Sequence, residues 1–121
     1  AALTLYSMAV TTRFPCPYLA ADVEITAERW SHICGRHPEL DVESSGRLAR
    51  TLADPDEIRS DSRYSGTRLF SRWFDDLLGG KILVIAVVTD QGGAARPTRH
   101  WVVTAYVTRR ITQGFIEWSR P

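Results

Sequence analysis

The sequence predicts an α+β fold in which two N-terminal helices pack on a curved, roughly four-stranded antiparallel sheet. Three observations predict it: two amphipathic helical patterns between residues 26 and 53, a β-branched run over 81–89, and regular alternation over 100–109. A chain of 121 residues suits one domain. We expect residues 1–25 to form an extended segment or hairpin and residues 26–121 to form the core.

The N-terminal segment is rich in residues that favour extended backbone. Pro15, Cys16 and Pro17 form a rigid turn, after which residues 18–25 can return as a second strand. We therefore expect either an extended arm or a hairpin here.

The first helix is predicted over residues 27–36. Thr26 is a good N-cap, and Pro38 disfavours helical backbone at the residue before it, so the helix ends there. Four residues at helical spacing form its apolar stripe: Trp30, Ile33, Cys34 and His37. His32 and Arg36 lie away from this stripe, one turn apart.

A second short helix opens at residues 44–46, buries Leu48 and Leu52, and stops before Asp54. We expect Ile58 to lie in a turn. Four strands follow, over residues 67–74, 81–89, 100–109 and 114–118. Alternation puts four residues on one face of the first of these strands: Arg68, Phe70, Arg72 and Phe74. In the third, Trp101, Val103, Ala105 and Val107 face one way and His100, Val102, Thr104, Tyr106 and Thr108 the other.

Charge is unevenly distributed along the chain, although the formal net charge is only +1. Residues 1–62 carry six arginines and ten acids, whereas residues 63–121 carry nine basic residues and four acids. Fourteen of the fifteen basic residues are arginines, which bind phosphate and carboxylate in a planar fork. The charge asymmetry would be explained by a C-terminal half that binds anions, or by two halves that pack together with complementary charge. The excess of arginine over lysine would be explained by a GC-rich genome.

Several protein classes are excluded or disfavoured. Neither cysteine belongs to a zinc-ligand pattern, and the GxGxxG, GxxxxGK[ST], HExxH and GxSxG motifs are absent. We therefore expect no metal and no cofactor. The longest apolar run, residues 82–88, is too short to cross a bilayer, so we expect no membrane association and a cytoplasmic protein with reduced thiols.

The stretch over residues 30–40 is the richest in groups that carry chemistry. Histidine is the residue type best suited to proton transfer at neutral pH, which makes His32 and His37 candidates, and Arg36 can hold a phosphate oxygen. His37 can equally cap the helix C-terminus, and His32 is either solvated or directed at a cleft. The five-residue spacing of the two histidines disfavours a shared metal ion.

A second candidate set lies on the strands. Thr104 and Tyr106 place hydroxyls in the middle of a strand, and Arg68 and Arg72 share a strand face. Together these residues would form a donor-rich floor suited to a phosphodiester. The alternative is a strand that simply presents its polar face to water.

These motifs together resemble a known family. The runs are His32-Ile33, Arg36-His37-Pro38-Glu39, Leu52-Ala53-Asp54-Pro55-Asp56-Glu57-Ile58, Arg68, Arg72, Val103-Thr104-Ala105-Tyr106 and Trp118. In this order they resemble the phage- and mobile-element-associated members of the barnase–EndoU–colicin–RelE-like nuclease superfamily. The resemblance extends from about Trp30 to Trp118.

The resemblance implies a metal-independent, toxin- or effector-like endoribonuclease that cleaves RNA by attack of the ribose 2′-OH, leaving a 2′,3′-cyclic phosphate. His32 and His37 would transfer protons, and Thr104 and Tyr106 would hydrogen-bond the scissile phosphate. The remaining phosphate ligands would be Arg36, Arg68 and Arg72. RNA and an antitoxin, immunity or phage protein would be the partners; no oligomeric state is predicted. Two alternatives stay open: a non-catalytic nucleic-acid- or protein-binding module, and a domain that binds a small anionic ligand.

Overall fold

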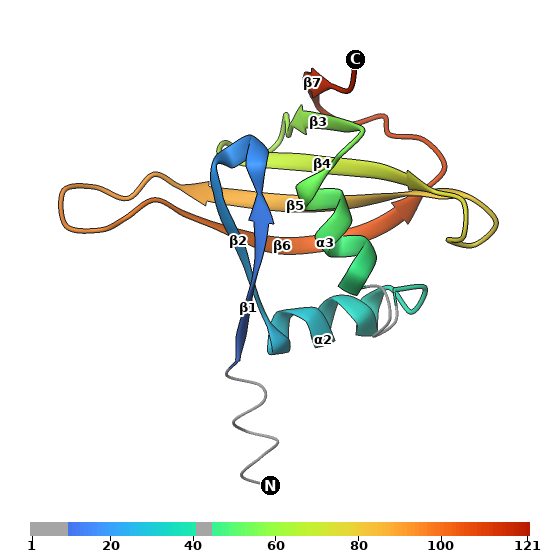
Figure 1. The fold of residues 1–121 in the computed structure, drawn as a ribbon, viewed down its shortest axis with the longest axis horizontal. Helices are drawn as coiled ribbons and strands as arrows, with labels where there is room; N and C mark the ends of the chain where they lie inside the picture. Colours follow the sequence, from blue (N-terminus) through green and yellow to red (C-terminus); the bar gives the residue numbers. More distant parts are fainter. Residues whose placement is uncertain (1–9, 41–44) are drawn as a thin grey trace, which may run out of the picture.

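A computed structural model describes residues 10–40 and 45–121, and one twisted sheet dominates it (Figure 1). The elements in chain order are β1 (Thr11–Cys16), η1 (Pro17–Leu19), β2 (Ala21–Thr26), α2 (Ala27–Arg36), α3 (Ser45–Ala53), β3 (Glu57–Ser60), β4 (Thr67–Phe74), β5 (Lys81–Asp90), β6 (Arg99–Thr108) and β7 (Phe115–Ser119). The strand order across the sheet is β1-β2-β6-β5-β4-β3-β7.

The predicted four-stranded antiparallel sheet is wrong, because the sheet has seven strands and is mixed. The hairpin β1–β2 joins it through parallel pairing of β2 with β6, where Glu24 lies opposite Trp101. Residue Ile58 lies in strand β3 rather than in a turn, and β7 pairs with that strand. A four-residue strand with one buried side chain carries too little periodicity to be recognised from sequence.

The local predictions for the two helices are confirmed. The Thr26 hydroxyl accepts a hydrogen bond from the Arg29 amide at 3.0 Å, and the chain leaves α2 at His37, directly before Pro38. The predicted stripe buries Ile33. In α3, Leu48 and Leu52 are fully buried, as expected. The proposed start at residue 44 lies outside the described residues.

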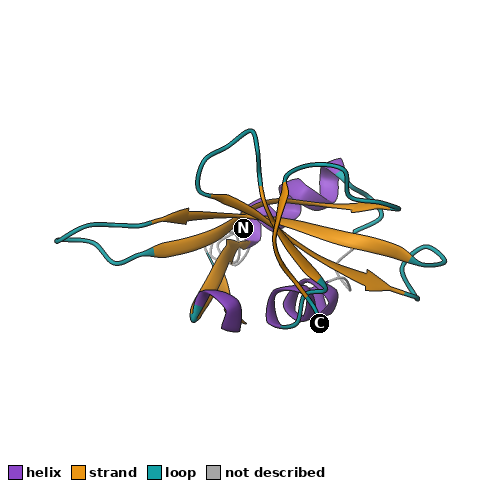
Figure 2. Ribbon diagram, turned by 90° about the horizontal axis from the view of Figure 1, so that it is seen from above, coloured by secondary structure: helices purple, strands orange, loops and turns teal. Residues whose placement is uncertain are grey.

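The main core lies between the sheet and α3. Strand β5 contributes Leu83, Ile85 and Val87 to it, and α3 contributes Leu48 and Leu52. Figure 2 shows α3 and the β1–β2 hairpin on the same side of the sheet. We call this side the helix face. It lies on one side of β5, whose continuous apolar run is explained by burial on both faces.

The opposite side of the sheet, here the loop face, has its own small core. Leu69, Val84 and Ala86 are buried there although they are not part of the main core, and Ile111 packs against them. Two loops, residues 61–66 and 109–114, are joined by a hydrogen bond from Arg63 to the side chain of Gln113. Arg59 of β3 donates a second hydrogen bond to the backbone carbonyl of Gln113. Loops thus take the place of a helix layer on this face.

The predicted alternation along β6 is interrupted. Thr104 pairs with Ala86, but Val102 pairs with the next residue of β5, so Val103 is an extra residue in a β-bulge. As a result, Val102 and Ala105 lie in the main core, whereas Val103 packs on the loop face. Relative to Thr104 and Tyr106, the faces predicted for His100, Trp101, Val102 and Val103 are therefore wrong.

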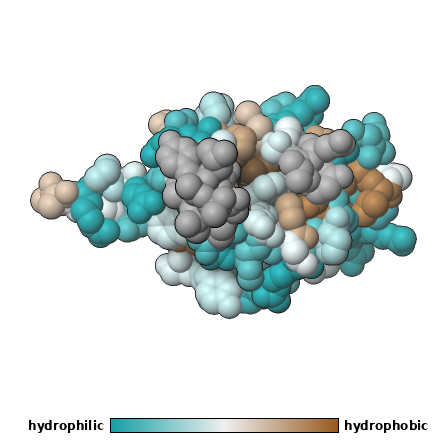
Figure 3. All heavy atoms as spheres, turned by 90° about the horizontal axis from the view of Figure 1, so that it is seen from below, coloured by the Kyte–Doolittle hydropathy of each residue, from teal (hydrophilic) through white to brown (hydrophobic). Residues whose placement is uncertain are grey.

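Seen from below, the described surface is mostly hydrophilic, with hydrophobic residues gathered near the β4–β5 turn (Figure 3). Among the described residues, neither helix combines the length and apolar character needed to cross a bilayer.

Candidate functional site

The candidate residues of α2 do not join the candidate residues of the strands in one site. His32 and Arg36 are exposed, and neither makes a hydrogen bond or ion pair to another described residue. His37 is the C-cap of the helix, and its Nδ1 atom lies 3.5 Å from Glu39 Oε1. The capping interpretation of His37 therefore matches its place in the structure.

The strand candidates lie on opposite faces of the sheet. Arg68 pairs with Val87 and Arg72 with Leu83, and both of these β5 residues belong to the main core, so the two arginines lie on the helix face. Thr104 pairs with Ala86 in the loop-face core. Tyr106 packs directly against that core. One phosphate group cannot contact both sets, so the expected donor-rich floor is not assembled.

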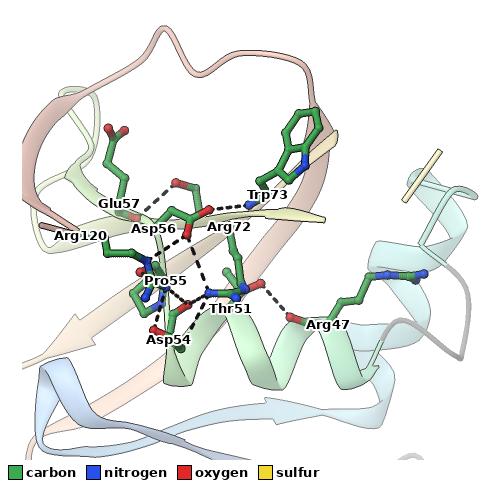
Figure 4. Close-up of polar contacts among 10 residues, drawn as sticks. Arg47, Thr51, Asp54, Pro55, Asp56, Glu57, Arg72, Trp73 and Arg120 are labelled. Carbon is green, nitrogen blue, oxygen red and sulfur yellow. Dashed lines mark hydrogen bonds and ion pairs between the residues drawn. The ribbon is translucent and has the colours of Figure 1, made fainter. Parts of the chain in front are cut away.

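Arg72 holds the turn between α3 and β3, as Figure 4 shows. It donates hydrogen bonds to the backbone carbonyl and carboxylate of Asp54 and lies 3.8 Å from the Asp56 carboxylate. Arg120 donates to the same two aspartates and to the Pro55 carbonyl. We call these four charged residues (Asp54, Asp56, Arg72 and Arg120) the turn clamp.

The turn clamp has the properties of a structural element. Its two arginines are balanced by two carboxylates, and the Arg72 side chain is only 14% exposed. The Asp56 carboxylate also accepts a hydrogen bond from the Trp73 amide at 2.8 Å, which ties the turn to β4. A phosphate ligand would have to displace all of these contacts, so Arg72 serves the fold in this structure.

Arg68, in contrast, lies at the centre of a partly exposed polar cluster. Its Nε atom donates to Glu117 Oε2 at 2.8 Å, and the Arg68 and Glu117 side chains are 29% and 26% exposed. The Tyr18 hydroxyl donates to the same carboxylate at 2.6 Å and the Ser60 hydroxyl donates at 2.7 Å. Burial alone would raise the pKa of Glu117, but these three donors outweigh it and hold the pKa below its usual range.

The cluster continues to a histidine. Arg68 Nη1 donates to Thr89 Oγ1 at 3.4 Å, and that oxygen lies 2.8 Å from His100 Nδ1. Burial lowers the pKa of His100, and the positive charge of Arg68 lowers it further. We call the six connected residues the Arg68 cluster: Tyr18, Ser60, Arg68, Thr89, His100 and Glu117.

Packing explains why residues so far apart in sequence meet. The ring of Tyr18 makes an edge contact with Phe70 and a tilted contact with Trp118, each at 6.2 Å between centroids. The pairing of β3 with β7 shifts register beside Glu117, which places Glu117 and Trp118 toward the same side. The hairpin and the last strand thereby converge on Arg68.

Sequence reasoning identified Arg68 and noted His100, but it missed Tyr18, Ser60, Thr89 and Glu117. One signal was available: Glu117 is the single acidic residue in the last 31 positions of a strongly basic half. No local pattern links it to Tyr18, which lies 99 positions earlier.

Among the described residues, no group of three or more His, Cys, Asp or Glu side chains could hold a metal ion. Comparison of the chain with protein-family models, with curated proteins and with solved structures gave no match.

Proposed function

We propose that this protein is a metal-independent endoribonuclease whose reactive centre is the Arg68 cluster rather than α2. The observation that supports it most is one continuous chain of contacts that joins a carboxylate, a guanidinium and an imidazole: Glu117, Arg68 and His100 through Thr89. Cleavage of RNA without a metal needs these three kinds of group: a base, a cation and an acid.

Glu117 is the base in this proposal. An ionised carboxylate offers about four acceptor positions, and Tyr18, Arg68 and Ser60 occupy three of them. The remaining position can accept the proton of a ribose 2′-OH. The 2′ oxygen then attacks phosphorus, and Arg68 stabilises the added negative charge.

His100 is the acid. Its protonated ring gives a proton to the departing 5′ oxygen, so the products are a 2′,3′-cyclic phosphate and a 5′-hydroxyl. Thr89 orients the ring through Nδ1. Glu117 gains one proton and His100 loses one, so a solvent exchange returns both groups to their starting states.

Exposed aromatic residues beside the cluster favour a single-stranded substrate. Phe115 pairs with Ser60 and therefore lies on the same side as the Ser60 hydroxyl, and it is 71% exposed. Tyr18 is 40% exposed. Stacking of a base on an aromatic ring contributes about 1–3 kcal/mol, so these two rings can hold the nucleotides on either side of the phosphate.

The test is cleavage of an end-labelled single-stranded RNA in EDTA. We expect His100→Gln and Glu117→Gln, which preserve side-chain size, to lower the rate by about 10²–10⁴. The matched controls are His32→Ala and His37→Ala, which we expect to retain wild-type rates. The rate should rise as the pH falls from 7, because burial lowers the pKa of His100 and acidification therefore increases the fraction of its protonated ring.

Other outcomes discriminate between functions. RNA that stays intact between pH 5 and pH 8 would rule out the ribonuclease. If the intact RNA binds with a steep dependence on salt, the protein is a non-catalytic binding module instead. Loss of cleavage in the His32 variant but not in the His100 variant would mean that the catalytic residues lie on α2.

A further inference from the structure

The loop face, on the opposite side of the sheet from Arg68, has a cavity of its own. The cavity has a volume of about 350 Å³ and opens beside the 61–66 loop. Its floor is apolar and is formed by Leu69, Ala86 and Val103. A volume of about 300–1,000 Å³ is typical of small-molecule sites.

Two hydroxyls line this cavity. The side chains of Thr104 and Tyr106 line it and are only partly exposed, yet neither hydroxyl forms a hydrogen bond with any residue that the structure describes. Burial raises the pKa of Tyr106; the charge of Arg63 opposes this shift and that of Asp61 supports it, so the hydroxyl keeps a proton to donate. Such hydroxyls are available to a ligand that offers an acceptor.

An acceptor on the protein side is also present. The Asp61 carboxylate lines the cavity with only 3% of its side chain exposed. Its Oδ1 atom accepts a hydrogen bond from the Arg63 amide at 2.8 Å and lies 3.5 Å from Arg63 Nε, whereas Oδ2 makes no hydrogen bond or ion pair with a described residue. Since Arg63 already balances the charge of Asp61, the site favours an uncharged ligand with a donor over a cation or an anion.

We propose that this cavity binds a small uncharged aromatic heterocycle that carries both a hydrogen-bond donor and an acceptor. The donor is bound by Asp61 and the acceptor by the hydroxyls of Thr104 and Tyr106. The apolar floor can pack against the face of an aromatic ring, and Tyr64, which also lines the cavity, adds an aromatic surface, with the Arg63 guanidinium 5.5 Å from its ring centre. The site is independent of the proposed ribonuclease, because the Arg68 cluster lies on the helix face.

The test uses three probes of similar size in an NMR titration of the wild-type protein. Benzimidazole has a donor and an acceptor, benzoxazole replaces the N–H group by oxygen, and benzoate is an anion. We expect saturable shifts of the Ala86 and Thr104 methyl signals with benzimidazole at about 1 mM or below. Binding of benzoxazole should be weaker by about tenfold, because Asp61 then lacks its partner.

Matched variants locate the site. Tyr106→Phe and Thr104→Val each remove one hydroxyl while keeping the side-chain shape, and each should weaken benzimidazole binding by about three- to tenfold. Tyr18→Phe removes a hydroxyl on the helix face and should leave that binding unchanged. The proposal is overturned if benzimidazole causes no saturable shift, if benzoate or benzoxazole binds equally well, or if Tyr18→Phe weakens binding as much as Tyr106→Phe.

Discussion

Substitution of Arg72 tests directly whether this residue has a structural or a catalytic role. Substitution of Arg72 by Ala removes its hydrogen bonds to the Asp54 carbonyl and carboxylate, which hold the turn between α3 and β3. Arg120 still reaches both Asp54 and the Pro55 carbonyl, so the turn loses one of its two arginines and keeps the other.

The expected loss follows from the contacts and their exposure. A hydrogen bond to a charged group contributes about 1.5–3 kcal/mol. The Arg72 side chain is 14% exposed, but the Asp54 side chain is 53% exposed, so water weakens the interaction. We therefore expect a loss of about 1.5 kcal/mol in the free energy of unfolding, which lowers Tm by about 5–9 °C for a chain of this length.

The assay combines thermal unfolding, followed by circular dichroism, with RNA cleavage at a temperature well below Tm. Arg72→Ala should lower Tm and leave cleavage by the folded protein within about twofold of wild type, whereas Arg68→Ala should lose cleavage by about 10² or more. Arg120→Ala is the control, because it removes the other arginine of the turn clamp and should lower Tm similarly. An Arg72→Ala protein with unchanged Tm and no cleavage would refute the structural assignment and make Arg72 a phosphate ligand.

Two further predictions concern stability. The pKa of Glu117 is lower in the folded protein than in the unfolded chain, where it is about 4.3, so the ionised carboxylate stabilises the fold above that pH. The difference in Tm between wild type and Glu117→Gln should therefore be largest above about pH 5. It should shrink as the pH falls through the folded-state pKa. A constant difference from pH 6 to pH 3 would contradict this. In α2, Ile33→Ala should lower the free energy of unfolding, measured with denaturant, by about 2–5 kcal/mol, because Ile33 is 1% exposed within the main core. His32 is exposed, so His32→Ala should change that free energy by about 0.5 kcal/mol or less. Similar losses for both variants would mean that α2 does not pack as described.

Local signals predicted much of the secondary structure. The start of α2 depends on Thr26 and its end on Pro38, and both act within one helical turn. The apolar run of β5 also predicts its own burial, because both faces of this strand are covered. In each case the residues that determine the element lie inside it or beside it.

The fold class required long-range pairing that no local pattern contains. Strand β3 exists because Glu57–Ser60 pairs with β4 on one side and with β7 on the other. The mixed character of the sheet depends on the single parallel contact between Glu24 and Trp101. These partners lie far apart in sequence, so their meeting depends on how the whole sheet packs.

The sequence by itself determined that Arg68 and Arg72 share a strand face, because side chains alternate along any strand. It also identified the hydroxyls of Thr104 and Tyr106, but only the register that pairs them with Ala86 and Val84 decided that they lie on the other side. Only the tertiary structure placed Tyr18, His100 and Glu117 around Arg68 and assigned Arg72 to the turn clamp. The physical reason is that periodicity defines faces within a strand, whereas the packing of distant strands decides which faces meet.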